Sequence, residues 1–265
     1  MKCSDIERKL SLLSLLDNCK ENTGLIVGRS DKNVSTVVVA YRVDKETVEY
    51  AVSVQADMII SYEPVIKEPL LTIKSQSYQG RILLQLLRHD IACYSLGRGF
   101  DMCDKGMAEW IAARMELSGD YEKAYSTQKG FTWIGQYNKE KSLEEITKIA
   151  GEAFQENEVR VFTQNVDKKG MTDAAVVVWA DDKSIDEAIE RGAQFIITCD
   201  IAYSEAVRAC SENKAVIVLS GETAENSFTD CMEQYLAEVL SSSVEILTMP
   251  VKRKSRIFIS GKEEV

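Results

Sequence analysis

The chain has 265 residues, of which 45% are hydrophobic and 28% charged, and its formal net charge at pH 7 is -10. This composition is typical of a folded globular protein and excludes a largely disordered chain. The negative charge also argues against general nucleic-acid binding, which requires a basic surface.

The cellular setting follows from the cysteines and from the distribution of apolar residues. Seven cysteines without a C-x-x-C pair indicate a reducing compartment. No stretch has the apolar length needed to span a membrane, and charged residues surround the leucines of residues 10–16, which favours an amphipathic helix over a signal peptide. We expect no membrane contact and a cytoplasmic location, with the nucleus as an alternative.

The first half of the chain alternates predicted helices and strands. The β-branched run 37–41 and the apolar run 58–61 are typical of strands buried on both faces, and Asp44 caps the helix between them. Pro64 ends the second of these strands, which places Glu63 on a loop at the strand tip. The remaining predicted elements are helices over 4–17, 80–89 and 104–117 and strands over 25–28 and 91–96.

The second half begins after a polar stretch at 118–129, which predicts a domain boundary near residue 125. Ser142 opens a helix over 143–154, and a turn is predicted at 221–225. The other elements are helices over 204–212 and 228–240 and strands over 132–137, 159–163, 174–179, 215–219 and 245–248. We assign residues 1–124, completed by 226–265, to a first α/β domain and residues 125–225 to a second.

An internal repeat supports this division. Asp44 lies over Asp181, and residues 59–61 lie over 196–198, at one constant separation. Residues 93–101 lie over 217–225 at a second separation, which matches Gly97 to Gly221. A chance likeness of two βαβ units is the alternative. We expect an α/β fold of two similar domains from an internal duplication, with mixed sheets flanked by helices.

Four acidic residues follow strand ends in this arrangement: Glu63, Asp101, Asp200 and Glu225. Ligands of open parallel sheets sit at the carboxyl ends of the strands, so facing halves would bring these carboxylates together. Clustered carboxylates bind hard cations such as Mg²⁺ or Mn²⁺.

Other catalytic chemistry has little support. His89 is the only histidine, and its predicted position at a helix end favours a solvated role over a catalytic one. Cys199 is either a metal thiolate or a buried core thiol, and the second reading is the default. The chain has no phosphate-binding G-x-x-x-x-G-K-[ST] motif.

The sequence resembles the Nif-three-like family, whose members are described as type 2 homologues of GTP cyclohydrolase I. Residues 56–64 are similar to the family's A-D-L-I-I-T-H-H-P signature, and residues 21–28 resemble its D-N-x-G-L-x-V-G opening. Residues 80–82, 90–94, 100–101 and 106–110 follow its G-R-I, D-I-A-V-Y, L-D and G-V-N-D-W segments. Residues 197–203 resemble I-T-G-D-I-K-Y, and residues 216–225 resemble V-I-D-A-G-H-Y-A-T-E.

The resemblance implies a site for two metal ions, held by paired histidines and by H-x-x-x-D and H-x-x-x-E motifs. In this chain Tyr62 and Glu63 stand at the paired histidines, and Gly97 and Gly221 stand at the other two. Asp101 and Glu225 remain, so Glu63, Asp101 and Glu225 are the residual metal positions and Tyr62, Gly97 and Gly221 the degenerate ones. Without imidazoles, affinity for transition metals falls sharply.

Two functions compete on this evidence. In the first, the chain is a non-catalytic relative, without catalytic residues or cofactor, that acts as a scaffold or as an interaction or regulatory protein. In the second, it is an altered hydrolase that holds one divalent cation (Mg, Mn or Zn) with carboxylates, uses Glu63 as base and acts on a nucleotide-like or phosphorylated substrate. Loss of every family histidine favours the first.

Three further expectations concern assembly, the tail and the old site. The resemblance implies a homohexamer of three dimers, although apolar helices such as 104–117 also suit a monomer core. The basic residues 252–256 suit a nuclear signal, a dock for an acidic partner or a plain solvated segment. We also expect the ancestral site to survive as a cavity in which the Tyr62 hydroxyl donates to Glu63 or Asp101.

Overall fold

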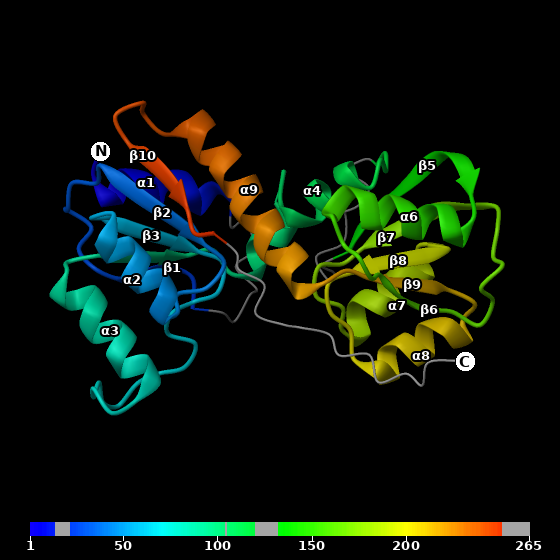
Figure 1. Cartoon of the computed structure of the whole chain (residues 1–265), viewed down its shortest axis with the longest axis horizontal. Helices are drawn as coiled ribbons and strands as arrows, with labels where there is room; N and C mark the ends of the chain where they lie inside the picture. The colour runs from blue at the N-terminus through cyan, green and yellow to red at the C-terminus, as the bar shows by residue number, and fades with distance from the viewer. Residues whose placement is uncertain (14–21, 104, 120–131, 251–265) are drawn as a thin grey trace, which may run out of the picture.

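The computed structural model describes residues 1–13, 22–103, 105–119 and 132–250. These residues form two five-stranded sheets toward opposite ends of the molecule, with helices α4 (Met107–Arg114) and α9 (Gly221–Val239) between them (Figure 1). The boundary predicted near residue 125 and the basic tail at 252–256 both lie outside the described residues.

The first sheet has the strand order β1-β4-β3-β2-β10, in which only β1 is antiparallel to its neighbour. Its central strands are in register through Val38, Ile59 and Cys93. Its strands are β1 (Gly24–Val27), β2 (Thr36–Ala40), β3 (Met58–Ser61), β4 (Ala92–Ser95) and β10 (Glu245–Thr248), and its helices are α1 (Cys3–Leu10), α2 (Lys45–Ser53) and α3 (Tyr78–Arg88). Short 3-10 turns occupy Ser11–Leu13 and Arg98–Met102.

The second sheet has the order β5-β7-β8-β9-β6, with antiparallel strands at both edges. Its strands are β5 (Trp133–Lys141), β6 (Arg160–Phe162), β7 (Met171–Val176), β8 (Phe195–Thr198) and β9 (Ala215–Val218), and its helices are α6 (Leu143–Phe154), α7 (Asp182–Glu190) and α8 (Tyr203–Ser211). Ser142 opens α6 with a capping box, in which its side chain accepts the Glu145 N–H and the Glu145 carboxylate accepts the Ser142 N–H.

The prediction of two similar α/β halves is confirmed. The unit β2-α2-β3-α3-β4 of the first half has its counterpart in β7-α7-β8-α8-β9, with three parallel strands in each. The equivalent residues Asp44 and Asp181 are both helix N-caps, and their carboxylates accept the N–H groups of Thr47 and Ser184. The same local chemistry therefore starts the same helix in both halves.

Successive residues of the central strands face opposite sides of the sheet and belong to different parts of the hydrophobic core. Val38 and Ile59 face α2 and α3, whereas Val39 and Ile60 face a central core that includes residues of α1, α4 and α9. The inner face of the second sheet contributes to this same core. The two halves therefore share one continuous apolar interior.

Helix α9 begins earlier than the sequence indicated. The turn predicted at 221–225 is wrong, because these residues form the start of α9. Ser220 is the N-cap, and its hydroxyl accepts the Thr223 N–H at 3.1 Å, which satisfies a first-turn amide. From there α9 packs against β2 and leads back to β10, which pairs with β2 in the first sheet.

None of the helices in the described parts of the chain is both long and apolar enough to cross a membrane.

Candidate functional site

The candidate site lies where the carboxyl ends of strands from both sheets approach each other. Arg42 follows β2, Tyr62 and Glu63 follow β3, Trp179 follows β7 and Gly221 follows β9. This is the sheet edge at which open α/β folds bind ligands.

A hydrogen-bonded chain of three side chains crosses between the halves. The Trp179 indole N–H donates to the Tyr62 hydroxyl at 3.1 Å, and that hydroxyl donates to Asp101 Oδ2 at 2.7 Å. Tyr62 and Asp101 are 3% and 2% exposed, so the tyrosine hydroxyl partners a buried carboxylate. Burial and the neighbouring Asp101 charge raise the pKa of Tyr62 well above its ordinary value, which keeps the donor proton in place. Of the two acceptors expected for the Tyr62 hydroxyl, Glu63 and Asp101, the structure contains the bond to Asp101.

Aromatic rings pack around the hydrogen-bonded side chains of Trp179 and Tyr62. Tyr41 stacks on Tyr62 with ring centroids 4.7 Å apart, and Phe228 of α9 meets both rings edge-on at 6.0 and 5.6 Å. Phe100 meets Phe228 at 5.7 Å, and Trp179 lies 6.2 Å from Tyr41. Packed aromatic rings thus surround Tyr62, the hydrogen-bond partner of Asp101.

Arg42 neutralises the other two predicted metal positions. Its guanidinium Nη1 lies 2.7 Å from Glu225 Oε1, and its Nη2 lies 3.9 Å from Glu63 Oε1. Lys67 approaches the second oxygen of Glu63 at 2.8 Å. The Glu225 side chain is only 17% exposed, which strengthens its pairing with Arg42 relative to a surface ion pair.

Arg42 and Trp179 occupy equivalent positions of the duplicated unit, each two residues before a helix N-cap. Arg42 reaches Glu225 at the start of α9, and Trp179 reaches Tyr62 of the first half. Arg98 adds a further crossing contact, donating to the Trp179 carbonyl at 3.1 Å. The repeat thus supplies a reciprocal pair of contacts that fastens the halves together.

The two glycines at degenerate positions differ in conformation. Gly97 has φ +65° and ψ -172°, a region that glycine alone adopts readily, and its N–H donates to the Tyr62 carbonyl at 2.9 Å. Gly221 is the first residue of α9, and a Cβ there would meet open space. Gly221 is exposed, so this open space is at the surface, and the expected cavity beside Asp101 and Glu225 stays a prediction.

The other candidates lie outside this network. Asp200 is exposed, and its side chain accepts the neighbouring Ile201 N–H. Cys199 is buried, and burial raises the pKa of its thiol. His89 is exposed at the C-cap of α3. Cys199 packs in the same apolar core as Tyr62, but among the described residues no hydrogen bond or ion pair joins any of the three side chains to Tyr62 or Arg42.

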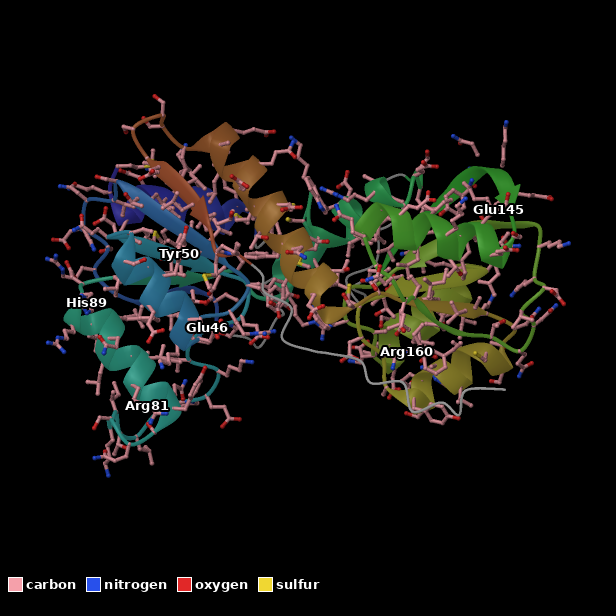
Figure 2. The ribbon with its side chains drawn as sticks, viewed as in Figure 1. Glu46, Tyr50, Arg81, His89, Glu145 and Arg160 are labelled. Carbon is pink, nitrogen blue, oxygen red and sulfur yellow. The ribbon has the colours of Figure 1, made fainter. Side chains whose placement is uncertain are left out.

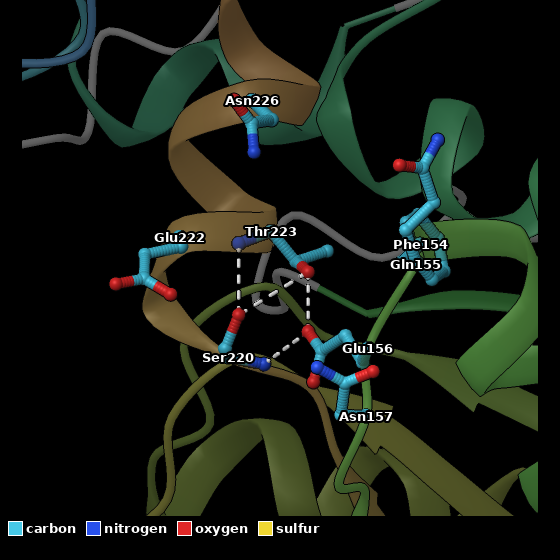
Figure 3. A pocket seen from close by; sticks show the side chains of 8 residues that line it. All are labelled: Phe154, Gln155, Glu156, Asn157, Ser220, Glu222, Thr223 and Asn226. Atoms are coloured by element: carbon cyan, nitrogen blue, oxygen red, sulfur yellow. Dashed lines mark hydrogen bonds between the residues drawn. The ribbon is translucent and has the colours of Figure 1, made fainter. Parts of the chain in front are cut away.

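A separate polar pocket of about 350 Å³ lies beside the first turn of α9 (Figure 3). Glu156 projects into it, and its Oε1 accepts the Ser220 N–H at 2.7 Å and the Thr223 hydroxyl. An internal carboxylate thus occupies the helix N-terminus, a position where free anions otherwise bind.

Comparison with known proteins identifies the family. The model of the DUF34/NIF3 (NGG1p interacting factor 3) family matches residues 1–255. The chain belongs to this family. A GTP cyclohydrolase 1 type 2 homolog from Streptococcus pneumoniae is 25% identical over 189 residues, which are 70% of this chain and 71% of that protein.

Two further relatives differ in how much of this chain they match. A GTP cyclohydrolase 1 type 2 homolog from Streptomyces coelicolor is 30% identical over 95 residues, which cover 36% of this chain and only 33% of that protein. A Staphylococcus aureus crystal structure matches with a TM-score of 0.82 and 17% identity, over 98% of this chain and 99% of that one. The structural likeness shows the DUF34/NIF3 fold.

The residues present do not fit the pair of metal ions that the DUF34/NIF3 resemblance implies. Within the described residues, no group of three or more His, Cys, Asp or Glu side chains is arranged to hold a metal ion. Asp101 accepts from Tyr62, and Glu63 and Glu225 pair with Arg42. The carboxylates thus have partners within the chain, and we derive no chemistry from a bound metal.

Sequence reasoning missed Arg42, Trp179, Tyr41 and Phe228. The missed signal lies in the repeat, because Arg42 and Trp179 share one repeat position just past a strand end. Their different side chains hide this equivalence, and their partners lie on elements distant in sequence.

Substitution of the two glycines should give unequal results. Gly97→Ala is expected to lower the free energy of unfolding by about 1–3 kcal/mol, because alanine is strained at positive φ. Gly221→Ala should change it by less than about 1 kcal/mol, since the site is helical and open. Urea unfolding of both variants measures the difference, and equal losses would contradict the assigned backbone conformations.

Proposed function

We propose that the chain is a non-catalytic member of the DUF34/NIF3 family that acts as a scaffold or interaction protein. The observation that carries this proposal is the Arg42 guanidinium between Glu225 and Glu63, at 2.7 and 3.9 Å. A guanidinium is a permanent cation, so it supplies positive charge to these carboxylates without Lewis acidity. In this proposal, a structural ion pair of Arg42 with Glu225 and Glu63 takes the place of a catalytic metal.

The remaining groups also suit a structural role. Metal-assisted hydrolysis needs an open coordination position and a base that can accept a proton. Asp101 is buried and accepts from the Tyr62 hydroxyl, and Glu63 pairs with Lys67 as well as Arg42. These contacts support a structural role, in which the side chains hold the protein together, over a role in hydrolysis.

Assembly and location are part of the proposal. We place the chain in the cytoplasm, without a bound cofactor, as a homo-oligomer that presents several copies of one surface to a protein partner. The family resemblance supports a hexamer of three dimers. Sedimentation equilibrium at micromolar concentration should give a mass several times 29.7 kDa, and a single-chain mass would contradict this part.

Activity assays test the proposal against the altered-hydrolase alternative. Purified protein should release no phosphate or ring-opened product from nucleoside triphosphates or simple phosphoesters with added Mg²⁺, Mn²⁺ or Zn²⁺. Glu63→Gln is the matched control, because it removes the candidate base and keeps the side-chain shape. Metal-dependent turnover that Glu63→Gln abolishes would overturn the proposal.

A further inference from the structure

Exposed apolar side chains gather on one segment of the first half. Six of the ten large apolar side chains that are exposed in the described residues lie between residues 70 and 87. Leu71 is 99% exposed, and Tyr78 and Leu87 are 59% and 56% exposed. We call this surface the α3 face; it comprises Leu70, Leu71, Ile73, Lys74, Tyr78, Arg81, Leu84, Leu87 and Arg88.

Helix geometry separates this face from the core. Ile82, Leu83 and Leu86 point inward to the sheet, whereas Leu84 and Leu87 lie on the solvent side of the same helix. Arg81 and His89 lie at the outer edge of the molecule in Figure 2, where α3 forms one end of the ribbon in Figure 1. Ordinary amphipathic helices place polar residues on this side, so the exposed leucines are unusual.

The loop before α3 is held in place. Ser77 caps α3, the Gln79 amide donates to the Val65 carbonyl at 2.8 Å, and Arg81 donates to the Gln76 carbonyl at 3.1 Å. A Cβ at Gly80 would lie 2.0 Å from the Lys74 carbonyl oxygen, so the loop packs directly on the helix backbone. The apolar face is thus preformed, which lowers the entropy cost of binding.

The charge of the α3 face is opposite to that of the chain. From Pro69 to His89 the sequence contains no Asp or Glu, although the chain carries 42 of them. Lys74, Arg81 and Arg88 are exposed there. Glu68 and Asp90 border this stretch in the sequence and are exposed, and Asp90 pairs with Arg29 at 3.0 Å.

We propose that the α3 face docks an acidic, amphipathic segment of a partner protein. Apolar side chains of that segment would cover Leu71, Leu84 and Leu87, and its carboxylates would face Lys74 and Arg88. An anionic membrane is the weaker occupant, because anionic lipids are typically bound by clusters of about four to eight basic residues. The α3 face has only Lys74, Arg81 and Arg88. The proposal deepens the interaction role above and depends on it.

Selection from a displayed library of random peptides tests this proposal without assuming a partner. Peptides enriched on the full-length protein should be rich in Asp, Glu and large apolar residues. Their affinity, measured by fluorescence anisotropy with labelled copies, should fall at least about tenfold for Leu71→Ser with Leu87→Ser and for Lys74→Glu with Arg88→Glu. Val166→Ser with Lys169→Glu makes one change of each kind on the other half and should leave the affinity unaltered.

Several outcomes would overturn the proposal. Selected peptides that lack acidic residues, or peptide affinities that the α3 variants do not change, would contradict it. Binding to phosphatidylserine vesicles in place of peptides would indicate a membrane. A sedimentation mass that falls in the same variants would indicate a contact between copies of this chain. Circular dichroism melts confirm that each variant folds. Hydrolysis in the activity assays would refute the non-catalytic role and leave the docking face untouched. The peptide-binding results test the docking face and leave the non-catalytic role untouched.

Discussion

Tyr62→Phe is expected to lower the free energy of unfolding by about 2–3 kcal/mol, although it removes one oxygen atom. The tyrosine hydroxyl donates to Asp101 at 2.7 Å and accepts from Trp179 at 3.1 Å, so the substitution weakens both contacts at once. Asp101 is 2% exposed, and water cannot readily replace the lost donor. Urea unfolding with unchanged m-value measures the loss.

The neighbouring ring supplies a matched control. Tyr41→Phe removes a hydroxyl from the ring stacked on Tyr62 but leaves the bond to Asp101 intact. We expect its effect to be clearly smaller. A double-mutant cycle of Tyr62→Phe with Asp101→Ala should give a coupling energy of about 1 kcal/mol or more, and additive losses would mean that the two side chains do not interact.

Arg42→Met is expected to convert the candidate site into a cation-binding site. The substitution keeps the length of the side chain and leaves Glu63 and Glu225 without the guanidinium that lies between them. Stability should fall by about 1 kcal/mol, because the pair is only partly buried. The affinity for Mn²⁺ should rise at least about tenfold, since a divalent ion can take the vacated position.

Lys67→Met is the control for Arg42→Met. Lys67 also pairs with Glu63, at 2.8 Å, but its side chain is 65% exposed. It should change stability and Mn²⁺ affinity little, because a surface ion pair contributes little free energy. If Lys67→Met and Arg42→Met raise Mn²⁺ affinity equally, the effect reflects net charge alone and the specific role of Arg42 is refuted.

Local sequence signals predicted much of the fold. The apolar runs of β2, β3 and β8 and the caps Asp44 and Asp181 are decided by neighbouring residues, and the structure contains them. The start of α9 was missed because Gly221 suggested a turn, whereas the Ser220 cap was decisive. The family resemblance was correct because its motifs cover nearly the whole chain.

The site was only partly predictable for a physical reason. The positions of Tyr62, Asp101 and Glu225 came from motif alignment. Donor and acceptor chemistry limited the acceptor of the Tyr62 hydroxyl to Glu63 or Asp101, and the structure decides for Asp101. Arg42 lies on the opposite half from Glu225, and Trp179 lies on the opposite half from Tyr62. No local sequence pattern predicts these contacts between the halves. The sequence also does not predict that Gly97 and Gly221 differ in backbone conformation.

Titration of wild-type protein with Mn²⁺ after EDTA treatment tests the central claim most directly. If Arg42 and Tyr62 have replaced the metal as partners of the site carboxylates, calorimetry should show no saturable binding tighter than about 1 mM. Stoichiometric binding at micromolar Mn²⁺ that Glu225→Gln removes would contradict the claim.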